Sequence, residues 1–358
     1  MAGIRPLRAD DLPRVADLFE ARRPGVDRAP SGMAEHFHAR FLEGPTYDPE
    51  VPSLVAEAGD GAVVGFIGAS VVPMLLDGRT VRAVATGPLV TARDARVIAA
   101  FLIRALIGGP QAFTFSDRQT LASHRLLVRL GARPMHPRCV TWVLPFRPFS
   151  YQLQRVRRTR PLASTLLRLP APLLDRGTAP FRRVTHDMRP LRTEPLASET
   201  VAASIPGLLA GARLRPRYDA GFWAWRMLEL QAAKRLGNLR AHAIYAGETL
   251  LGWYVYLASR GDVSHVLQLL ARPGEEATVL GELVRDAARC GTVALKGRLE
   301  PELDLALRDV RCTLEHGPCL LVHARDGAVY EAFASDKAVL TPLDGEAWIS
   351  ATFPGAVA

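Results

Sequence analysis

Residues 4–8 read Ile-Arg-Pro-Leu-Arg, and residues 188–192 read Met-Arg-Pro-Leu-Arg. Two later pairs of segments match in the same order: residues 62–66 with residues 249–253, and residues 132–139 with residues 310–319. Each match is weak alone, but all three pairs lie at nearly the same separation along the chain. The shared order and spacing predict a duplicated unit of helices and strands.

The chain is long enough for two domains. It has 358 residues, and a single hydrophobic core seldom serves more than about 250–300 residues. We therefore expect an N-terminal domain at 1–147, a linker at 148–187 and a C-terminal domain at 188–358. A hydrophobic content of 48% with 23% charged residues is ordinary for a soluble globular protein.

The positive charge is concentrated in one segment. The net charge is +9, and the stretch from Arg147 to Arg183 holds nine arginines and a single acid, Asp175. The rest of the chain is therefore close to neutral, so no general DNA-binding surface is expected. Because this segment is also rich in proline and leucine, it fits a connector packed on the domains. The alternative is a basic arm, 147–183, that contacts an anionic membrane surface.

Cysteine and histidine usage predicts no metal site. The four cysteines form no CxxC pair, and no histidine cluster has zinc-ligand spacing. We expect four reduced thiols in a cytoplasmic protein. The N-terminus does not resemble a signal peptide, and the longest apolar stretch, 62–76, is too short and too interrupted for a membrane helix. The scarcity of lysine beside arginine indicates a GC-rich bacterial source.

Hydrophobic periodicity predicts the elements of the first half. Leu12, Val15 and Leu18 have helical spacing after two acids, and the glycines at 59 and 78 mark hairpin turns. The expected strands are 4–7, 53–58, 62–72, 80–90, 112–115 and 140–144, and the expected helices begin near Leu12 or span 31–42, 94–107 and 121–130. This order fits a mixed sheet with helices on both faces, an α/β (α+β) fold.

The second half repeats this order with changes. A helix is expected around residues 221–227. The expected strands are 241–245, 250–258, 263–270, 293–295 and 319–323, and two further helices are expected at 276–290 and 302–310. The sequence therefore predicts two related domains in tandem.

Three stretches of the first half resemble the GNAT (Gcn5-related N-acetyltransferase) superfamily. Residues 4–12 resemble its opening, 63–66 its third strand, and 122–132 its last helix with the following turn. The resemblance covers nearly all of 1–147 and, more loosely, 188–350. It implies a tandem GNAT-like protein, of a type in which one half can be degenerate. The cluster at 222–226, Phe-Trp-Ala-Trp-Arg, also resembles a helix of bacterial GNAT-like proteins from cell-surface polysaccharide clusters.

The resemblance implies acetyl-CoA or another acyl-CoA as co-substrate. The family binds the pyrophosphate with backbone N–H groups at a helix start, which carry partial positive charge. The matching candidates here are Leu89, Val90, Arg93, Asp94, Ala95, Arg96, Val97, Ile98 and Ala99. Val97 and Ala99 stand where the family has glycine or a small residue, and the arginines could contact phosphate directly. A plain helix start is the alternative.

The corresponding loop of the second half is less suitable for phosphate. Glu275 and Glu276 precede the expected helix 276–290, and carboxylates there complement the helix dipole and repel a pyrophosphate. We therefore expect any acyl-CoA site in the first half.

The catalytic groups are less clear in the sequence. The family often uses a tyrosine on its last helix as the acid for the leaving thiolate, and Leu127 stands at that position. Ser116 and His124 are the candidates to replace it, although His124 also fits a surface helix residue. In the second half, Tyr254 could line an acceptor pocket together with Tyr256, or both could pack in the sheet.

Three functions remain open. The first is an acyl-CoA-dependent N-acyltransferase that acts on a small-molecule amine, such as an amino sugar. The second is a catalytically inactive tandem GNAT-like protein that serves as a binding or scaffold module. The third is a transferase that uses aminoacyl-tRNA, with the basic segment contacting RNA. No Walker loop, HExxH or GxSxG motif points to other chemistry.

Overall fold

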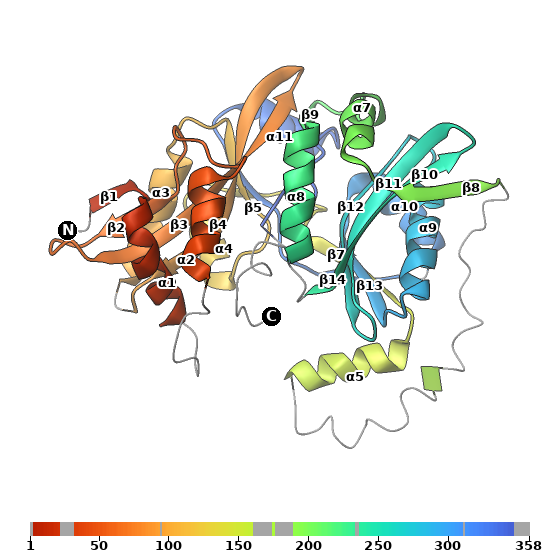
Figure 1. Cartoon of the computed structure of the whole chain (residues 1–358), viewed down its shortest axis with the longest axis horizontal. Helices are drawn as coiled ribbons and strands as arrows, with labels where there is room; N and C mark the ends of the chain where they lie inside the picture. The colour runs from red at the N-terminus through yellow and green to blue at the C-terminus, as the bar shows by residue number, and fades with distance from the viewer. Residues whose placement is uncertain are drawn as a thin grey trace. The chain divides into compact units, whose positions relative to one another are not determined.

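The structure of the chain is a computed structural model (Figure 1). It describes residues 3–21, 32–93, 95–159, 174–175, 189–232, 236–310 and 312–346. The chain forms two compact units, and each draws on both halves of the sequence. Unit 1 comprises Met1–Met135, Gly211–Arg226 and Cys319–Ala358, and unit 2 comprises His136–Ala210 and Met227–Pro318. Each unit has a mixed sheet with helices, which confirms the predicted fold class.

The sheet of unit 1 has the strand order β1-β2-β3-β4-β5-β15-β6. These strands are β1 (Gly3–Pro6), β2 (Leu54–Glu57), β3 (Val63–Leu76), β4 (Arg79–Thr91), β5 (Phe113–Ser116), β15 (Leu321–Ala324) and β6 (Arg133–Pro134), and β9 (Leu214–Pro216) pairs with β3. Strands β4 and β5 are parallel, and the other pairs are antiparallel.

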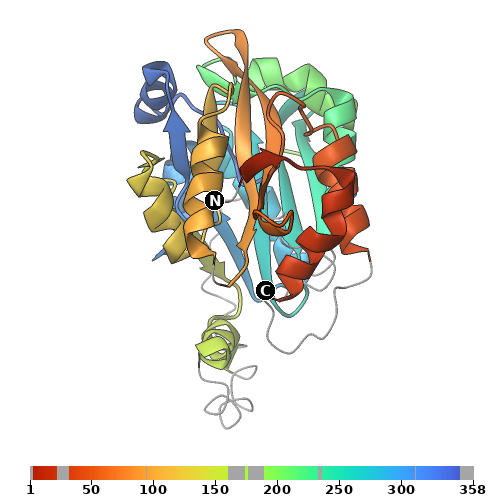
Figure 2. The same cartoon turned by 90° about the vertical axis from the view of Figure 1, so that its left-hand side faces the viewer.

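Helices cover both faces of this sheet (Figure 2). One face packs on α3 (Arg96–Ile107) and α4 (Leu121–Arg129), and the other packs on α1 (Leu12–Glu20), α2 (Met33–His38), the π-helical η2 (Ala39–Glu43) and α11 (Gly327–Ala334). The alternation of side chains along β3 explains this division: Ile67 and Ala69 face α3, whereas Val72 and Met74 face α11. A short 3-10 turn, η1 (Ala9–Asp11), precedes α1.

The sheet of unit 2 has the order β14-β7-β13-β12-β11-β10-β8. Its strands are β14 (Thr313–His316), β7 (Val140–Pro145), β13 (Ala294–Arg298), β12 (Val263–Ala271), β11 (Thr249–Ala258), β10 (Asn238–Ala246) and β8 (Leu191–Pro195). Its helices are α5 (Pro148–Thr159), α7 (Ser198–Leu208), α9 (Glu276–Arg289), η5 (Pro301–Leu303) and α10 (Asp304–Asp309). Helix α8 (Ala220–Ala232) has its first residues, up to Arg226, in unit 1. As in unit 1, one strand pair, β12 with β13, is parallel.

The two sequence halves exchange their closing strands. Strand β7 comes from the first half but pairs with β13 and β14 of unit 2. Strand β15 comes from the second half but pairs with β5 and β6 of unit 1. The predicted domain boundaries, 1–147 and 188–358, describe the repeat along the sequence and stay a prediction. The compact units are assembled from other segments of the chain.

The region 148–187 contains more regular structure than a simple linker. Its first twelve residues form α5, whose N-terminal amides at Phe149 and Ser150 are capped by the buried carboxylate of Asp175, at 2.9 and 3.2 Å. Most of the basic segment 147–183 lies outside the described residues. Its contact with a membrane stays a prediction.

The strand exchange predicts where two core substitutions act. Trp142 of β7 is 1% exposed and donates from its indole to the Arg298 carbonyl at 3.1 Å. Leu321 of β15 is equally buried in unit 1. We expect Trp142→Ala to destabilise the protein by about 3–5 kcal/mol and to lower hydrogen-exchange protection in β11–β13. We expect Leu321→Ala to destabilise it by about 2–5 kcal/mol and to lower protection in β3–β5. Loss of protection in the opposite unit would contradict the exchange.

Candidate active site

The site of interest lies where β4 and β5 of unit 1 separate. The two strands pair only through Ala83–Ala85 and Phe113–Phe115, and β4 then continues to Thr91. Opposite β3, the register of β4 shifts beside Gly87. A Cβ on Gly87 would lie 2.9 Å from the Cα of Gly68. The missing side chains allow the backbones to approach closely, and this bulge bends β4.

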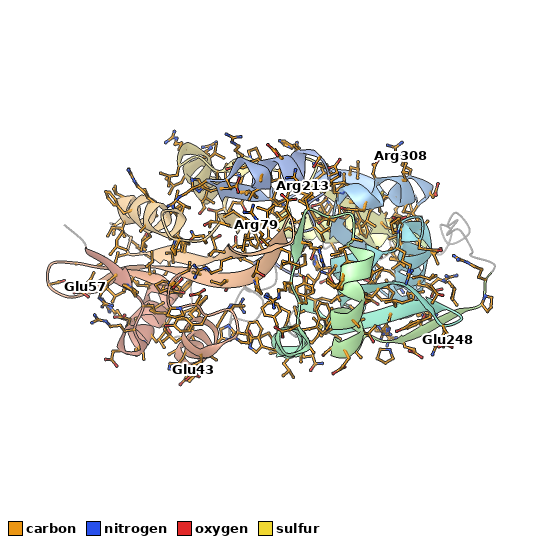
Figure 3. The ribbon with its side chains drawn as sticks, turned by 90° about the horizontal axis from the view of Figure 1, so that it is seen from above. Glu43, Glu57, Arg79, Arg213, Glu248 and Arg308 are labelled. Atoms are coloured by element: carbon orange, nitrogen blue, oxygen red, sulfur yellow. The ribbon has the colours of Figure 1, made fainter. Side chains whose placement is uncertain are left out.

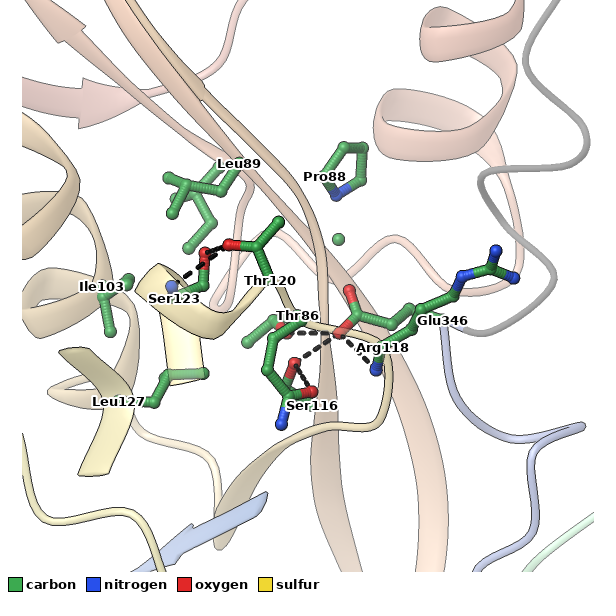
Figure 4. A pocket seen from close by; sticks show the side chains of 13 residues that line it. Thr86, Pro88, Leu89, Ile103, Ser116, Arg118, Thr120, Ser123, Leu127 and Glu346 are labelled. Atoms are coloured by element: carbon green, nitrogen blue, oxygen red, sulfur yellow. Dashed lines mark hydrogen bonds between the residues drawn. The ribbon is translucent and has the colours of Figure 1, made fainter. Parts of the chain in front are cut away.

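The separated strands enclose a small cavity (Figure 4). Its volume is about 130 Å³, enough for several water molecules. Strand β4, the loop after β5, helices α3 and α4, and the C-terminal segment all contribute to its wall. The lining residues are Ile67, Thr86, Gly87, Pro88, Leu89, Ile103, Ser116, Arg118, Gln119, Thr120, Ser123, Leu127 and Glu346.

The carboxyl group of Glu346 points into this cavity (Figure 4). Its Oε1 accepts a short hydrogen bond from Ser116 Oγ, another from Thr86 Oγ1 at 3.3 Å, and a third from the backbone N–H of Arg118 at 3.4 Å. Thr86 and Ser116 belong to the two separating strands. Glu346 therefore bridges the opening between β4 and β5, although the residue keeps part of its surface exposed.

A buried network holds the segment that carries Glu346. The carboxylate of Asp344 accepts from the hydroxyl of Tyr218, and from the backbone N–H and Oγ1 of Thr341 at 2.7 and 2.8 Å. The N–H of Glu346 donates to Asp117 Oδ1 at 2.8 Å. Gly345 fits against the same aspartate, because a Cβ there would lie 2.0 Å from its Oδ2.

The surroundings favour the protonated form of Glu346. Removal of the carboxyl group from water, followed by the nearby negative charge of Asp117, raises its pKa well above the ordinary value of 4.5. The hydrogen bonds from Ser116, Arg118 and Thr86 act in the opposite direction but are weaker. A carboxyl group with a raised pKa can exchange protons near neutral pH, which is a property of a general base or acid.

Two residues predicted from the sequence come together at this site. The buried Ser116 Oγ lies 3.3 Å from Gln119 Oε1, besides its bond to Glu346. Gln119 Nε2 donates to the Cys319 carbonyl at 2.8 Å and lies 3.3 Å from His124 Nδ1. His124 therefore reaches the cavity only through Gln119. Sequence reasoning missed Glu346, because it follows an ordinary Asp-Gly turn and has no match in the first half.

The predicted phosphate loop forms the start of α3. Leu89 and Val90 end β4, and Ala95 occupies the N-cap position without a side-chain cap. Val97 is 70% exposed in the first turn of the helix. Arg93 is directed elsewhere, since its Nη2 donates to the Ala21 carbonyl at 3.2 Å.

The structure describes some of the other residues that were predicted for this loop. Ile98 and Ala99 are partly buried in the first turns of α3. The backbone of Arg96 begins the helix. Asp94 and the side chain of Arg96 lie outside the described residues.

Comparison with solved structures places this arrangement among known proteins. The chain matches a GCN5-related N-acetyltransferase from Kribbella flavida, with 15% identity and a TM-score of 0.52 over 90% of this chain and 72% of the other. It matches one from Anabaena variabilis with 10% identity and a TM-score of 0.58, over 91% and 73%. A probable N-acyltransferase from Enterococcus faecalis V583 matches with 9% identity and a TM-score of 0.56, over 90% and 73%.

The chain has the GNAT fold. At these identities the similarity establishes the fold alone. No family model matches the sequence, and neither does any curated protein. Within the described part of the chain, none of the helices combines the length and the apolar character needed to cross a membrane.

The second GNAT-like unit differs from the first at the position that corresponds to Ser116. Strand register places Gly297 of β13 where β5 has Ser116. A Cβ on Gly297 would lie 2.5 Å from the indole of Trp142, which therefore packs directly on this position. The start of α9 is also occupied, because Glu275 at its N-cap forms a two-pronged ion pair with Arg189 at 2.7 and 3.0 Å. The predicted unsuitability of that loop for phosphate stays a prediction.

Tyr254 lies in the core of this second unit. It is 0% exposed, stacks on His242 with ring centroids 5.6 Å apart, and lines neither cavity described here. Burial raises the pKa of its hydroxyl, which has no hydrogen-bond partner among the described residues. The structure thus places Tyr254 in a different unit from Ser116 and His124.

The cysteine prediction is only partly right. Cys290 and Cys312 are free thiols, whereas Cys139 and Cys319 are disulfide-bonded. The sequence offered no CxxC spacing from which this state could be inferred. Among the described residues, no group of three or more histidine, cysteine, aspartate or glutamate side chains could hold a metal ion.

The raised pKa of Glu346 predicts a pH-dependent contribution to stability. The folded state favours its protonated form, so this contribution is complete below about pH 4.5 and is lost as the pH rises through the raised pKa. We expect Glu346→Gln, which imitates the neutral acid, to lose less melting temperature than the wild type as the pH rises. Glu248→Gln is the control, because Glu248 is fully exposed (Figure 3). Equal pH dependence in all three proteins would contradict the prediction.

Proposed function

We propose that the protein is an acyl-CoA-dependent N-acyltransferase whose reaction takes place in unit 1. The observation that carries this proposal is the carboxyl group of Glu346, hydrogen-bonded to Ser116 inside the opening between β4 and β5. It supplies a proton-exchanging group in a strand opening that lies beside the start of α3. The GNAT fold supports an acyltransferase but does not define the substrate.

The residues at the start of α3 fit an acyl-CoA pyrophosphate. The first turn of a helix presents N–H groups with partial positive charge, and no side chain caps them here. The candidate contacts are the backbone N–H groups of Arg96 and Val97, and when bound the cofactor supplies the acyl group as a thioester.

Glu346 is the proposed general base. In the reaction, the amine nitrogen forms a bond to the acyl carbon, the carbon–sulfur bond breaks, and the amine loses one proton. Glu346 accepts that proton, for which its raised pKa suits it. Ser116 orients the carboxyl group through its hydrogen bond, and in this proposal the proton that Glu346 takes up passes through the Ser116 hydroxyl to the leaving sulfur.

The charge of the site favours an amine acceptor. Glu346 and Asp117 lie close together, joined by the hydrogen bond from the backbone of one to the carboxylate of the other. Two neighbouring carboxyl groups attract an ammonium ion and disfavour an anionic acceptor. A small amine, such as an amino sugar, is therefore the proposed acceptor class.

The alternative of an inactive protein fits unit 2 better than unit 1. In unit 2 the indole of Trp142 packs on Gly297, the position that corresponds to Ser116, and Arg189 with Glu275 occupies the helix start. In unit 1 a cavity remains at the corresponding place. We propose that the two units divide their roles, with chemistry in unit 1.

Calorimetry with acetyl-CoA and a turnover assay over a panel of amines test the proposal. We expect binding to the wild type, and we expect Glu346→Gln to lower kcat about 10²–10⁴-fold with little change in acetyl-CoA affinity, because a general base contributes about that much. Glu248→Gln is the matched control. If the wild type neither binds acetyl-CoA nor changes its melting temperature in its presence, the proposed function is wrong.

The pH profile separates a base from a structural role. With Glu346 as the base, kcat should rise with pH along a limb whose midpoint lies above 4.5, because the carboxylate form is the active one. Glu346→Gln should remove this limb from the residual activity. A limb that persists unchanged in the variant would assign it to another group.

A further inference from the structure

A second cavity lies within unit 2, between α5 and its sheet. Its volume is about 570 Å³, within the range of about 300–1,000 Å³ that is usual for ligand pockets. Its lining residues come from α5 on one side and from strands β12, β13 and β14 on the other. Figure 1 shows where these elements lie in unit 2. The lining residues are Tyr151, Gln152, Gln154, Arg155, Val156, Val263, His265, Lys296 and Glu315.

The charges on these walls are unusual for the face of a sheet. In the parallel pair of unit 1, Ala85 and Phe115 are the paired residues at the point where the strands separate, and both are at most 2% exposed in an apolar core. In unit 2 the same register positions hold His265 and Lys296. Both residues are partly exposed, so polar and charged groups stand here in place of a buried apolar pair.

Glu315 organises the cationic groups. Its carboxylate pairs with Arg155 from α5, lies 3.9 Å from Lys296 Nζ and accepts from the Tyr151 hydroxyl at 3.4 Å. One acid thus holds two cations from opposite walls at the edge of the same cavity. The described charged side chains of the lining, two cations and one anion, sum to a positive charge, and His265 adds a further donor or cation.

A few contacts hold the helix wall. Tyr151 is 6% exposed and packs with Val143, Val263 and Val293. Gln154 Nε2 donates to the Gly261 carbonyl at 2.9 Å, and the carboxylate of Asp175 caps the helix start. Val156 and Val263 add apolar surface beside the charged groups. The cavity therefore lies between two walls, and its lining has both a cationic region and an apolar region.

We propose that this cavity binds a small organic anion, with a carboxylate or phosphate group against Lys296, Arg155 and His265 and an apolar part against Val156 and Val263. Such a site lies outside the proposed active site and belongs to the other unit. Its ligand would be a second substrate or an effector, and recognition rests on an anionic group joined to a small apolar body.

Ligand-observed NMR titrations of the full chain with benzoate, phenyl phosphate and the neutral benzyl alcohol test this site. We expect at least one anionic probe to bind about tenfold or more tightly than benzyl alcohol at low salt, since one ionic contact in a partly enclosed site is of that order. The better anionic probe identifies the preferred group. Excess CoA should not displace it, which separates this site from the start of α3.

Two variants assign the binding to this cavity. Lys296→Met should weaken the anionic probe about tenfold, whereas Lys337→Met, at an exposed lysine of unit 1, should leave it unchanged. Arg155→Gln provides a second test on the more exposed wall, in case the first variant folds poorly. The proposal is overturned if neither anion binds more tightly than benzyl alcohol, or if binding survives both substitutions in folded protein.

Discussion

The close approach of Gly68 and Gly87 is the constraint on which the candidate active site depends. A side chain on Gly87 would meet the backbone of Gly68, and one on Gly68 would lie 2.8 Å from the ring of Phe41. With neither side chain present, β4 can bulge against β3 and turn away from β5. Thr86 and Ser116 then face each other across an opening that the carboxyl group of Glu346 can enter. In a continuous sheet these two strands would be bonded along their length and no such opening would exist.

Local patterns in the sequence were sufficient to place most elements but not their partners. The apolar runs at 140–144 and 319–323 predict buried strands correctly, because burial leaves a mark on composition. They do not reveal which sheet receives each strand, since both sheets offer an apolar edge. Ser116 could be proposed from its place after a strand. Glu346 could not, because its position depends on Tyr218, Asp117 and Ser116, which lie more than a hundred residues away along the chain.

The repeated opening motif makes different contacts in the two units. Arg5 forms a two-pronged pair with Asp11 at 2.8 Å and also contacts Glu57, so it fixes the first strand to the turn before α1. Arg189, its counterpart, instead holds Glu275 at the start of α9. The arginine of the motif thus joins a strand to a turn in one unit, whereas in the other it pairs with the carboxylate at a helix start. Trp142, supplied by the first half of the chain, fills the matching position in unit 2.

The electrostatics of Glu346 connect the fold to the proposed reaction. Its carboxylate form is disfavoured by loss of water and by Asp117, so ionisation of an empty site leaves two neighbouring negative charges with little compensation. An ammonium ion in the opening would provide the missing positive charge and stabilise the ionised form. The bound acceptor would then favour the ionised form of Glu346, which is the form that can accept a proton from the acceptor. Because the segment Thr341–Glu346 is held mainly through Asp344, the carboxyl group of Glu346 can change its charge without loss of the network that positions it.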